Sequence, residues 1–171
     1  EDFLAGRRGL LDAVVFSGGE PLAQAALIPA MARAKELGFK VGLHTSGIFP
    51  LRFADALAFA DWVGFDVKAQ FDDYEAVTGV KSSGARARES LKILVASGVD
   101  YEVRTTVSLR AHTPASLMAL ATALHHAGVR RYAVQKEREG ACVADGSDLS
   151  GICDQRANLE TMFASFELRN A

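Results

Sequence analysis

The sequence predicts an α/β protein built on a parallel sheet. Short apolar runs alternate with longer segments of helical periodicity, and the connections between them are short. Three helical segments end in a glycine followed by an apolar residue, the usual helix stop signal, at Gly38, Gly98 and Gly128. The predicted strands are too few to close an eight-stranded barrel, which leaves a partial barrel or an open doubly wound sheet.

The predicted elements follow in order from the N-terminus, where Glu1–Gly9 resembles the tail of a helix. Apolar runs predict strands over Ala13–Phe16, Lys40–His44, Trp62–Val67, Tyr101–Val107 and Arg131–Val134. Helical periodicity predicts helices over Leu22–Leu37, Leu51–Ala60, Gly84–Ser97 and Ala115–Ala127. Thr113 and Pro114 supply the N-cap and first position of the last of these helices.

The chain changes character after the fifth predicted strand. The stretch Lys136–Gly151 is rich in glycine and lacks apolar periodicity, which predicts a loop or lid. The apolar spacing over Asp154–Phe166 predicts a terminal amphipathic helix. We therefore expect a core over residues 1–135, with residues 136–171 forming a loop and helix that pack on it or cover it.

Composition limits the classes of function. The 171 residues carry a net charge of −2, from 19 basic and 21 acidic side chains, and this balance argues against nucleic acid as the main partner. We find neither a signal peptide nor an apolar stretch long enough to span a membrane. The two cysteines, Cys142 and Cys153, match no common metal-binding spacing and fit a reducing, cytoplasmic location better than a second metal site.

The most informative local feature is the end of the first strand, Ser17-Gly18-Gly19-Glu20-Pro21. Glycines allow positive φ and let a ligand approach the backbone, and proline is preset for the first turn of a helix. This pattern predicts a junction that holds a small ligand against main-chain N–H groups. The alternative is an ordinary tight turn between strand and helix.

The ends of the other predicted strands are also polar. Ligands of parallel sheets bind beyond the carboxyl ends of the strands. This sequence has Thr45-Ser46-Gly47, Asp66, Lys68 and Gln135 at those ends, and the fourth strand contains Arg104. Side-chain alternation puts Asp66, Lys68, Arg104 and Gln135 on a face that is otherwise lined by very small residues. Two explanations remain open: an internal ion pair of Asp66 with Lys68 or Arg104, or a zwitterionic ligand with an amine and a carboxylate.

Five motifs in this order resemble a known family: Gly18-Gly19-Glu20-Pro21, Thr45-Ser46-Gly47, Asp66-Val67-Lys68, Tyr74-Glu75-Ala76-Val77-Thr78-Gly79 and Tyr101-Glu102-Val103-Arg104. Together they are similar to the radical S-adenosylmethionine (SAM) enzymes that activate glycyl-radical enzymes, in particular the anaerobic ribonucleoside-triphosphate reductase activating proteins. The similarity covers most of Leu11–Gln135. It implies a six-stranded partial (β/α) barrel whose first strand precedes Glu1.

The resemblance also implies cofactors and site residues. SAM and a [4Fe-4S] cluster would be the cofactors, with Gly18, Gly19 and Glu20 at the amino group of SAM. Lys68 and Arg104 would face its carboxylate or ribose. The other residues that the resemblance assigns to the cofactor site are Pro21, Thr45, Ser46, Gly47, Asp66 and Gln135.

The implied reaction is the reductive cleavage of SAM to generate a glycyl radical on anaerobic ribonucleotide reductase. A flavodoxin-like or ferredoxin-like protein would supply the electron. Two departures stand out. The Cys-x-x-x-Cys-x-x-Cys motif that binds the cluster is absent, and we expect it upstream of Glu1. His44 stands where related activating enzymes place an aspartate of a cation site.

Three alternatives remain open at this stage. The chain could be another radical SAM enzyme, because many share the Gly-Gly-Glu-Pro element. It could be an aldolase-like barrel that uses Lys68 as a Schiff-base amine. It could also be a SAM-binding module without catalytic activity.

Overall fold

The computed structural model describes residues 2–107, 112–136 and 155–169. Its strands are β1 (Ala13–Phe16), β2 (Lys40–Thr45), β3 (Trp62–Asp66), β4 (Asp100–Val107), β5 (Arg131–Lys136) and β6 (Ser165–Arg169). Its helices are α1 (Asp2–Ala5), the 3₁₀ helix η1 (Pro21–Ala23), α2 (Leu27–Glu36), α3 (Pro50–Leu57), α4 (Tyr74–Thr78), α5 (Ser83–Ser97), α6 (Pro114–His126) and α8 (Arg156–Met162).

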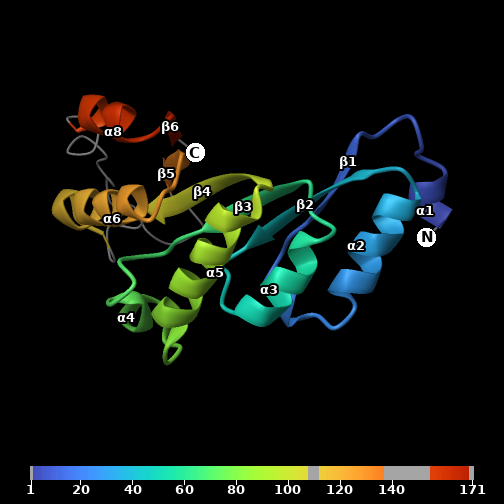
Figure 1. Cartoon of the computed structure of the whole chain (residues 1–171), viewed down its shortest axis with the longest axis horizontal. Coiled ribbons are helices and arrows are strands. Elements are labelled where there is room, and N and C mark those ends of the chain that lie inside the picture. Colours follow the sequence, from blue (N-terminus) through green and yellow to red (C-terminus); the bar gives the residue numbers. More distant parts are fainter. Residues whose placement is uncertain (1, 108–111, 137–154, 170–171) are drawn as a thin grey trace, which may run out of the picture. The chain divides into compact units, whose positions relative to one another are not determined.

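The strands form one sheet in the order β1-β2-β3-β4-β5-β6 (Figure 1). β1 with β2, β2 with β3, β4 with β5 and β5 with β6 all pair in parallel. The predicted fold class, α/β with a parallel sheet, is therefore confirmed. Parallel neighbours need a crossover, and the helices between consecutive strands supply it.

Two predicted helices differ from the structure. The segment Leu22–Leu37 is divided into η1 and α2, because Gln24 adopts an extended conformation (φ −84°, ψ 123°) that ends the first turn. The segment Asp154–Phe166 is helical only to Met162, and the chain then enters β6, which pairs with β5. Pairing with a neighbouring strand has overridden the helical periodicity there. The sequence analysis also did not predict α4.

The rest of the predicted lid, residues 137–151, lies outside the described residues, as do Cys142 and Cys153. Lys136 is the last residue of β5. The expected division of the chain at residue 135 stays a prediction.

The chain divides into two compact units. Unit 1 comprises Glu1–Phe65 and Arg86–Tyr101, and unit 2 comprises Asp66–Ala85 and Glu102–Ala171. In unit 1, α2 packs against β2 and α3, as the cartoon in Figure 1 shows. The unit 1 core contains fully buried Leu22, Met31, Leu43, Phe53 and Phe65.

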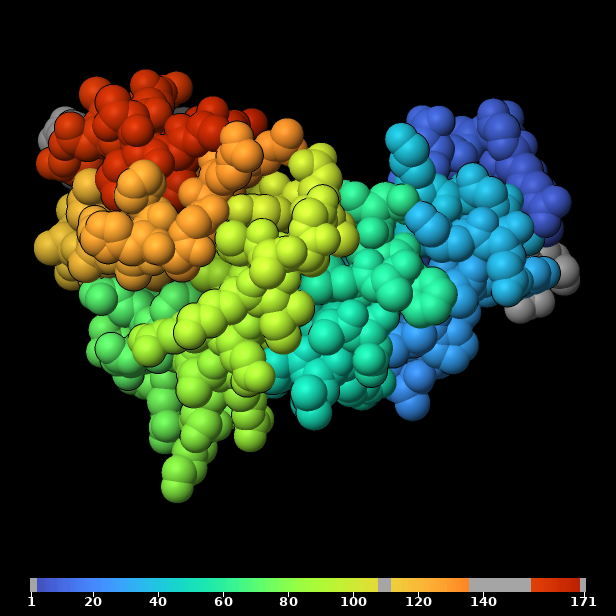
Figure 2. Space-filling model, in the orientation of Figure 1, coloured from blue at the N-terminus to red at the C-terminus, as the bar shows by residue number. Residues whose placement is uncertain are grey.

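The core of unit 2 is rich in aromatic residues. Tyr132 of β5 lies 5.1 Å from Phe163 and 6.0 Å from Phe166, measured between ring centroids, and these contacts join α8 and β6 to β5. In the space-filling view of Figure 2 the orange and red segments α6, β5, α8 and β6 form one continuous block. Among the helices of the described residues, none has both the length and the apolar character needed to cross a membrane.

Candidate functional site

The turn after β1 has the backbone that its sequence predicts. Gly18 and Gly19 have φ values of +88° and +52°, and no heavy atom beyond the adjoining residues lies within 4 Å of where a Cβ would stand on either residue. The glycines are therefore required by the left-handed backbone and not by crowding. Glu20 is the N-cap of η1, and Pro21 occupies its first turn.

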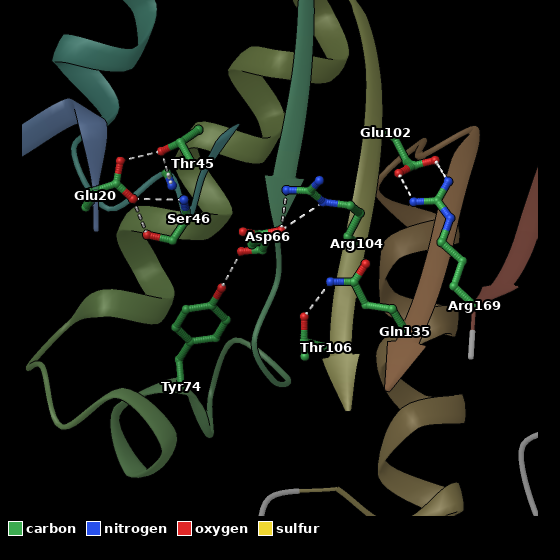
Figure 3. Close-up of polar contacts among 11 residues, drawn as sticks. Glu20, Thr45, Ser46, Asp66, Tyr74, Glu102, Arg104, Thr106, Gln135 and Arg169 are labelled. Atoms are coloured by element: carbon green, nitrogen blue, oxygen red, sulfur yellow. Dashed lines mark hydrogen bonds and ion pairs between the residues drawn. The ribbon is translucent and has the colours of Figure 1, made fainter. Parts of the chain in front are cut away.

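The carboxylate of Glu20 joins the end of β1 to the end of β2, as Figure 3 shows. Its Oε1 accepts hydrogen bonds from the Leu22 N–H (3.1 Å) and the Thr45 hydroxyl (2.7 Å). Its Oε2 accepts from the N–H (2.9 Å) and the hydroxyl (2.6 Å) of Ser46. All four donors are neutral, so these bonds hold the carboxylate in place without cancelling its negative charge.

A chain of hydrogen bonds continues from Glu20 into the core of unit 1. Thr45 Oγ1 accepts from the Gly47 N–H at 3.0 Å, and the Gly47 carbonyl accepts from the Ser90 hydroxyl of α5 at 2.5 Å. Gly47 has a φ of +69°, and a Cβ there would overlap the ring of Phe65. Sequence analysis missed Ser90. A serine between the buried Ala87 and Leu91 on the apolar face of α5 is the signal that could have revealed it.

In unit 2, Asp66 and Arg104 form an ion pair. Asp66 Oδ1 accepts a hydrogen bond from Arg104 Nε at 3.0 Å and lies 2.8 Å from Arg104 Nη2 (Figure 3). The Arg104 side chain is 12% exposed and that of Asp66 is 34% exposed. Of the two explanations that the sequence left open, the internal pair of Asp66 with Arg104 is therefore present.

Lys68 follows β3 and has an exposed side chain. Its backbone N–H donates to the hydroxyl of Tyr74 at 3.0 Å, and its carbonyl lies 2.8 Å from Nε2 of His112. Both partners are buried. Tyr74 lies within a motif that the sequence analysis quoted, but neither it nor His112 was predicted as a site residue.

Further polar contacts involve side chains of the unit 2 strands. The Gln135 amide donates to the Thr106 hydroxyl at 2.9 Å. Arg169 of β6 forms a bidentate ion pair with both carboxylate oxygens of Glu102, at 2.8 and 2.7 Å (Figure 3). Arg169 also bonds Glu167. The hydrogen bond to Glu102 is the main cause that raises the pKa of Arg169 above its usual range.

The structure thus gathers the predicted residues into two groups. Unit 1 brings together Glu20, Thr45, Ser46 and Gly47, while unit 2 pairs Asp66 with Arg104. His44, the residue that differs from the resembled pattern, lies edge-on to Trp62 with ring centroids 5.5 Å apart. The part of the chain that the structure describes contains no group of three or more histidine, cysteine, aspartate or glutamate residues that could hold a metal ion.

The chain is similar in sequence to a known protein. A Methanocaldococcus jannaschii protein named as a glycyl-radical enzyme activating enzyme, MJ1227, is 33% identical over 102 residues, which are 56% of this chain and 42% of that protein. The chain therefore spans less than half of that relative's length.

Solved structures of low sequence identity share the fold. A domain of pyruvate-formate lyase-activating enzyme from Bacteroides vulgatus has a TM-score of 0.74 at 12% identity, covering 92% of this chain and 99% of that one. Streptococcus suis SuiB bound to S-adenosylmethionine has a TM-score of 0.71 at 14% identity, covering 93% and 39%. At such identities the likeness supports the fold alone, and that fold is the partial (β/α) barrel that the sequence analysis expected.

Residues 2–124 match the Radical SAM superfamily. This match covers most of the chain and contains both the Glu20 group of unit 1 and the Asp66–Arg104 pair of unit 2. The chain belongs to the Radical SAM superfamily.

Proposed function

We propose that this chain is part of a radical SAM activase that generates a glycyl radical on anaerobic ribonucleotide reductase. The relative named for glycyl-radical enzyme activation supports the general reaction. The motif resemblance, from Gly18-Gly19-Glu20-Pro21 to Tyr101-Glu102-Val103-Arg104, supports the reductase as the target. We further propose a cytoplasmic protein whose electron donor is flavodoxin-like or ferredoxin-like.

The observation that carries the proposal is the hydrogen-bonded carboxylate of Glu20. Its four neutral donors fix both oxygens and leave one net negative charge beside a glycine turn with open space. A fixed anion of this kind favours an ammonium group. We assign Gly18, Gly19 and Glu20 to the amino group of SAM, with Thr45, Ser46 and Gly47 holding the carboxylate of Glu20 and Pro21 starting the helix behind it.

In unit 2 the exposed ammonium of Lys68 is the group best suited to a carboxylate. Arg104 is paired with Asp66, and that pairing leaves Lys68 the stronger candidate of the two. We retain Arg104, Asp66 and Gln135 as cofactor-binding residues on the strength of the motif resemblance.

The residues present do not fit a [4Fe-4S] cluster. The family motif needs three cysteines, whereas the chain has only Cys142 and Cys153, with ten residues between them. Within the activase a cluster and SAM together supply the radical chemistry. The contribution of this chain is to bind and orient SAM.

The test of this proposal is the affinity of the full-length protein for SAM, measured by calorimetry. Lys68→Ala removes one charge-assisted contact, worth about 1.5–3 kcal/mol, so the affinity should fall roughly 10- to 100-fold with the fold intact. An unchanged affinity would remove Lys68 from the site. The target is tested separately, by looking for a glycyl radical signal on anaerobic ribonucleotide reductase by electron paramagnetic resonance.

No observation favours the Schiff-base alternative. An amine that forms a Schiff base is usually activated by burial in an apolar pocket or by a neighbouring cation, and the Lys68 side chain is exposed. If Lys68 binds a carboxylate and forms no Schiff base, borohydride trapping with a carbonyl substrate will leave Lys68 unmodified.

A further inference from the structure

Side chains from two other segments of unit 2 bond both backbone groups of Lys68. The Tyr74 hydroxyl accepts from the Lys68 N–H (3.0 Å) and donates to the Asp66 carbonyl (3.3 Å). The Lys68 carbonyl lies 2.8 Å from His112 Nε2. A carbonyl can only accept, so Nε2 is the nitrogen that carries a proton in this contact.

Tyr74 is itself held firmly. It is fully buried and stacks on Phe71, with ring centroids 5.9 Å apart and an interplanar angle of 17°. Its carbonyl accepts from the Thr78 hydroxyl at 2.8 Å, and that hydroxyl also bonds Ser83 Oγ at 2.7 Å. Packing around Tyr74 therefore fixes the hydroxyl that accepts the hydrogen bond from the Lys68 N–H.

Gly84 makes this packing possible. A Cβ on Gly84 would overlap the carbonyl of Phe71 and come within 2.9 Å of the Tyr74 Cβ. Only glycine lets the start of α5 lie this close to the segment that contains Phe71 and Tyr74. Tyr74–Thr78, together with Ser83 and Gly84, thus forms a packed support that holds the Tyr74 hydroxyl against the Lys68 N–H.

The support has a consequence for binding. The backbone of Lys68 is fixed by tertiary contacts, while its side chain is free to extend into solvent. Binding an anion then orders only the side chain, which lowers the entropy lost on binding. A lysine on a loose loop would lose backbone freedom as well.

We propose that Tyr74 and His112 are positioning residues that fix Lys68 for the carboxylate of SAM. This inference rests on the proposed function of Lys68 and extends it to residues to which neither the motif resemblance nor the comparisons give a role. Neither Tyr74 nor His112 needs to touch SAM. Both act through the backbone of Lys68.

The first test is Tyr74→Phe in the full-length protein, with SAM affinity measured by calorimetry. The variant leaves the Lys68 N–H without its acceptor, and SAM affinity should fall about 3- to 10-fold. The affinity for decarboxylated S-adenosylmethionine should not change, because that ligand offers Lys68 no carboxylate. His112→Ala should act in the same direction.

Tyr132→Phe is the matched control. Tyr132 is also a buried tyrosine of unit 2, and its hydroxyl donates to Thr105 Oγ1 at 2.9 Å, away from Lys68. This variant should lower the free energy of unfolding without changing the ratio of the two ligand affinities. An equal loss of SAM affinity in Tyr74→Phe and Tyr132→Phe would show a general structural effect and overturn the inference.

A second readout is independent of SAM. Hydrogen exchange at the Lys68 amide should become faster in Tyr74→Phe and stay unchanged in Tyr132→Phe. Unchanged exchange at Lys68 would show that Tyr74 does not fix the Lys68 backbone and would overturn the inference.

If Lys68→Ala leaves SAM affinity unchanged, the proposed role of Lys68 fails, and the positioning role toward SAM fails with it. If Lys68→Ala weakens binding but Tyr74→Phe does not, only the positioning role is wrong.

Discussion

The two units differ in the groups that bond the carboxylates near their strand ends. In unit 1 the carboxylate of Glu20 is bonded, among the described residues, only by neutral N–H and O–H donors. In unit 2 the carboxylate of Asp66 is paired with the cation of Arg104. Unit 1 therefore keeps a net negative charge at its strand ends, whereas the Asp66–Arg104 pair is neutral and leaves Lys68 as an exposed positive charge. A carboxylate held by neutral donors suits a cationic group, and an exposed lysine suits an anionic one.

Gly47→Ala should have the largest effect on stability. The substitution places a Cβ against the buried ring of Phe65 and strains a backbone with φ of +69°, so the free energy of unfolding should fall by about 2–4 kcal/mol. Gly19→Ala is the control, because its φ is +52° but its surroundings are open, and only about 1 kcal/mol should be lost. Urea unfolding measures both. Equal losses would mean that the packing of Phe65 against Gly47 is not what fixes this turn.

Glu20→Gln comes next. The amide has only one acceptor oxygen, and its NH₂ group faces donors, so the variant should lose about 1.5–3 kcal/mol of unfolding free energy. Because the partners of Glu20 are neutral, the loss should be nearly the same at low and high salt. A loss that disappears at high salt would show that Glu20 acts through an ion pair instead.

Arg104→Met tests the contrasting arrangement in unit 2. The variant leaves Asp66 without its cation, but Asp66 is a third exposed, so water can solvate it and the loss should be only about 1–2 kcal/mol. Unlike the loss in Glu20→Gln, this one should shrink as salt rises, because the pair is partly screened. Urea unfolding of the variant and the wild type at two salt concentrations measures it. If the loss of unfolding free energy in Arg104→Met does not depend on salt, the carboxylates of Asp66 and Glu20 are not held by different kinds of interaction.

Ser90→Ala should have a smaller effect. It removes the donor to the Gly47 carbonyl, and the loss should be about 1 kcal/mol. Hydrogen exchange at the Gly47 amide should also speed up, because that amide bonds Thr45 in the same chain of contacts. Unchanged exchange at Gly47 would show that Ser90 is only a core residue.

The smallest effect concerns Asp61, a carboxylate of unit 1 that does have a lysine partner. Burial alone would raise its pKa, but hydrogen bonds from Lys35 (2.7 Å) and the Val41 N–H (2.7 Å) outweigh burial and lower the pKa below 3.8. A lowered pKa in the folded state stabilises the protein above the unfolded value and loses that contribution as pH falls through the folded value. Wild type and Asp61→Asn should therefore differ by a constant amount near neutral pH and converge below about pH 4 in urea unfolding. A difference that grows on acidification would reverse the sign and contradict the assignment.

Sequence reasoning could find residues whose signal is local. The glycines of the β1 turn were visible because a left-handed backbone needs them. Thr45 and Asp66 were visible because they end strands, and Arg104 because it is a charged residue within an apolar strand. Ser90 and His112 were not found because their partners are distant in sequence: Ser90 lies 43 positions from Gly47, and His112 lies 44 positions from Lys68. Tyr74 is only six positions from Lys68, but its hydrogen bond depends on the path of the chain between the two residues, which no local pattern shows. A hydroxyl or imidazole of this kind looks like any other polar residue until the fold supplies its partner.

The sequence by itself determined the parallel sheet, the strand ends and the turn of Gly18 and Gly19, because hydrophobic period and glycine conformation are local properties. Only the tertiary structure decided that Ser165–Arg169 is a strand. Phe166 fits the helical spacing of Met162 and Phe163 as well as the alternation with Leu168, and pairing with β5 together with the packing of Phe163 and Phe166 on Tyr132 made the choice. The tertiary structure also decided which charges are paired. An ion pair depends on the distance between side chains of different strands, and that distance is set by sheet register and not by sequence spacing.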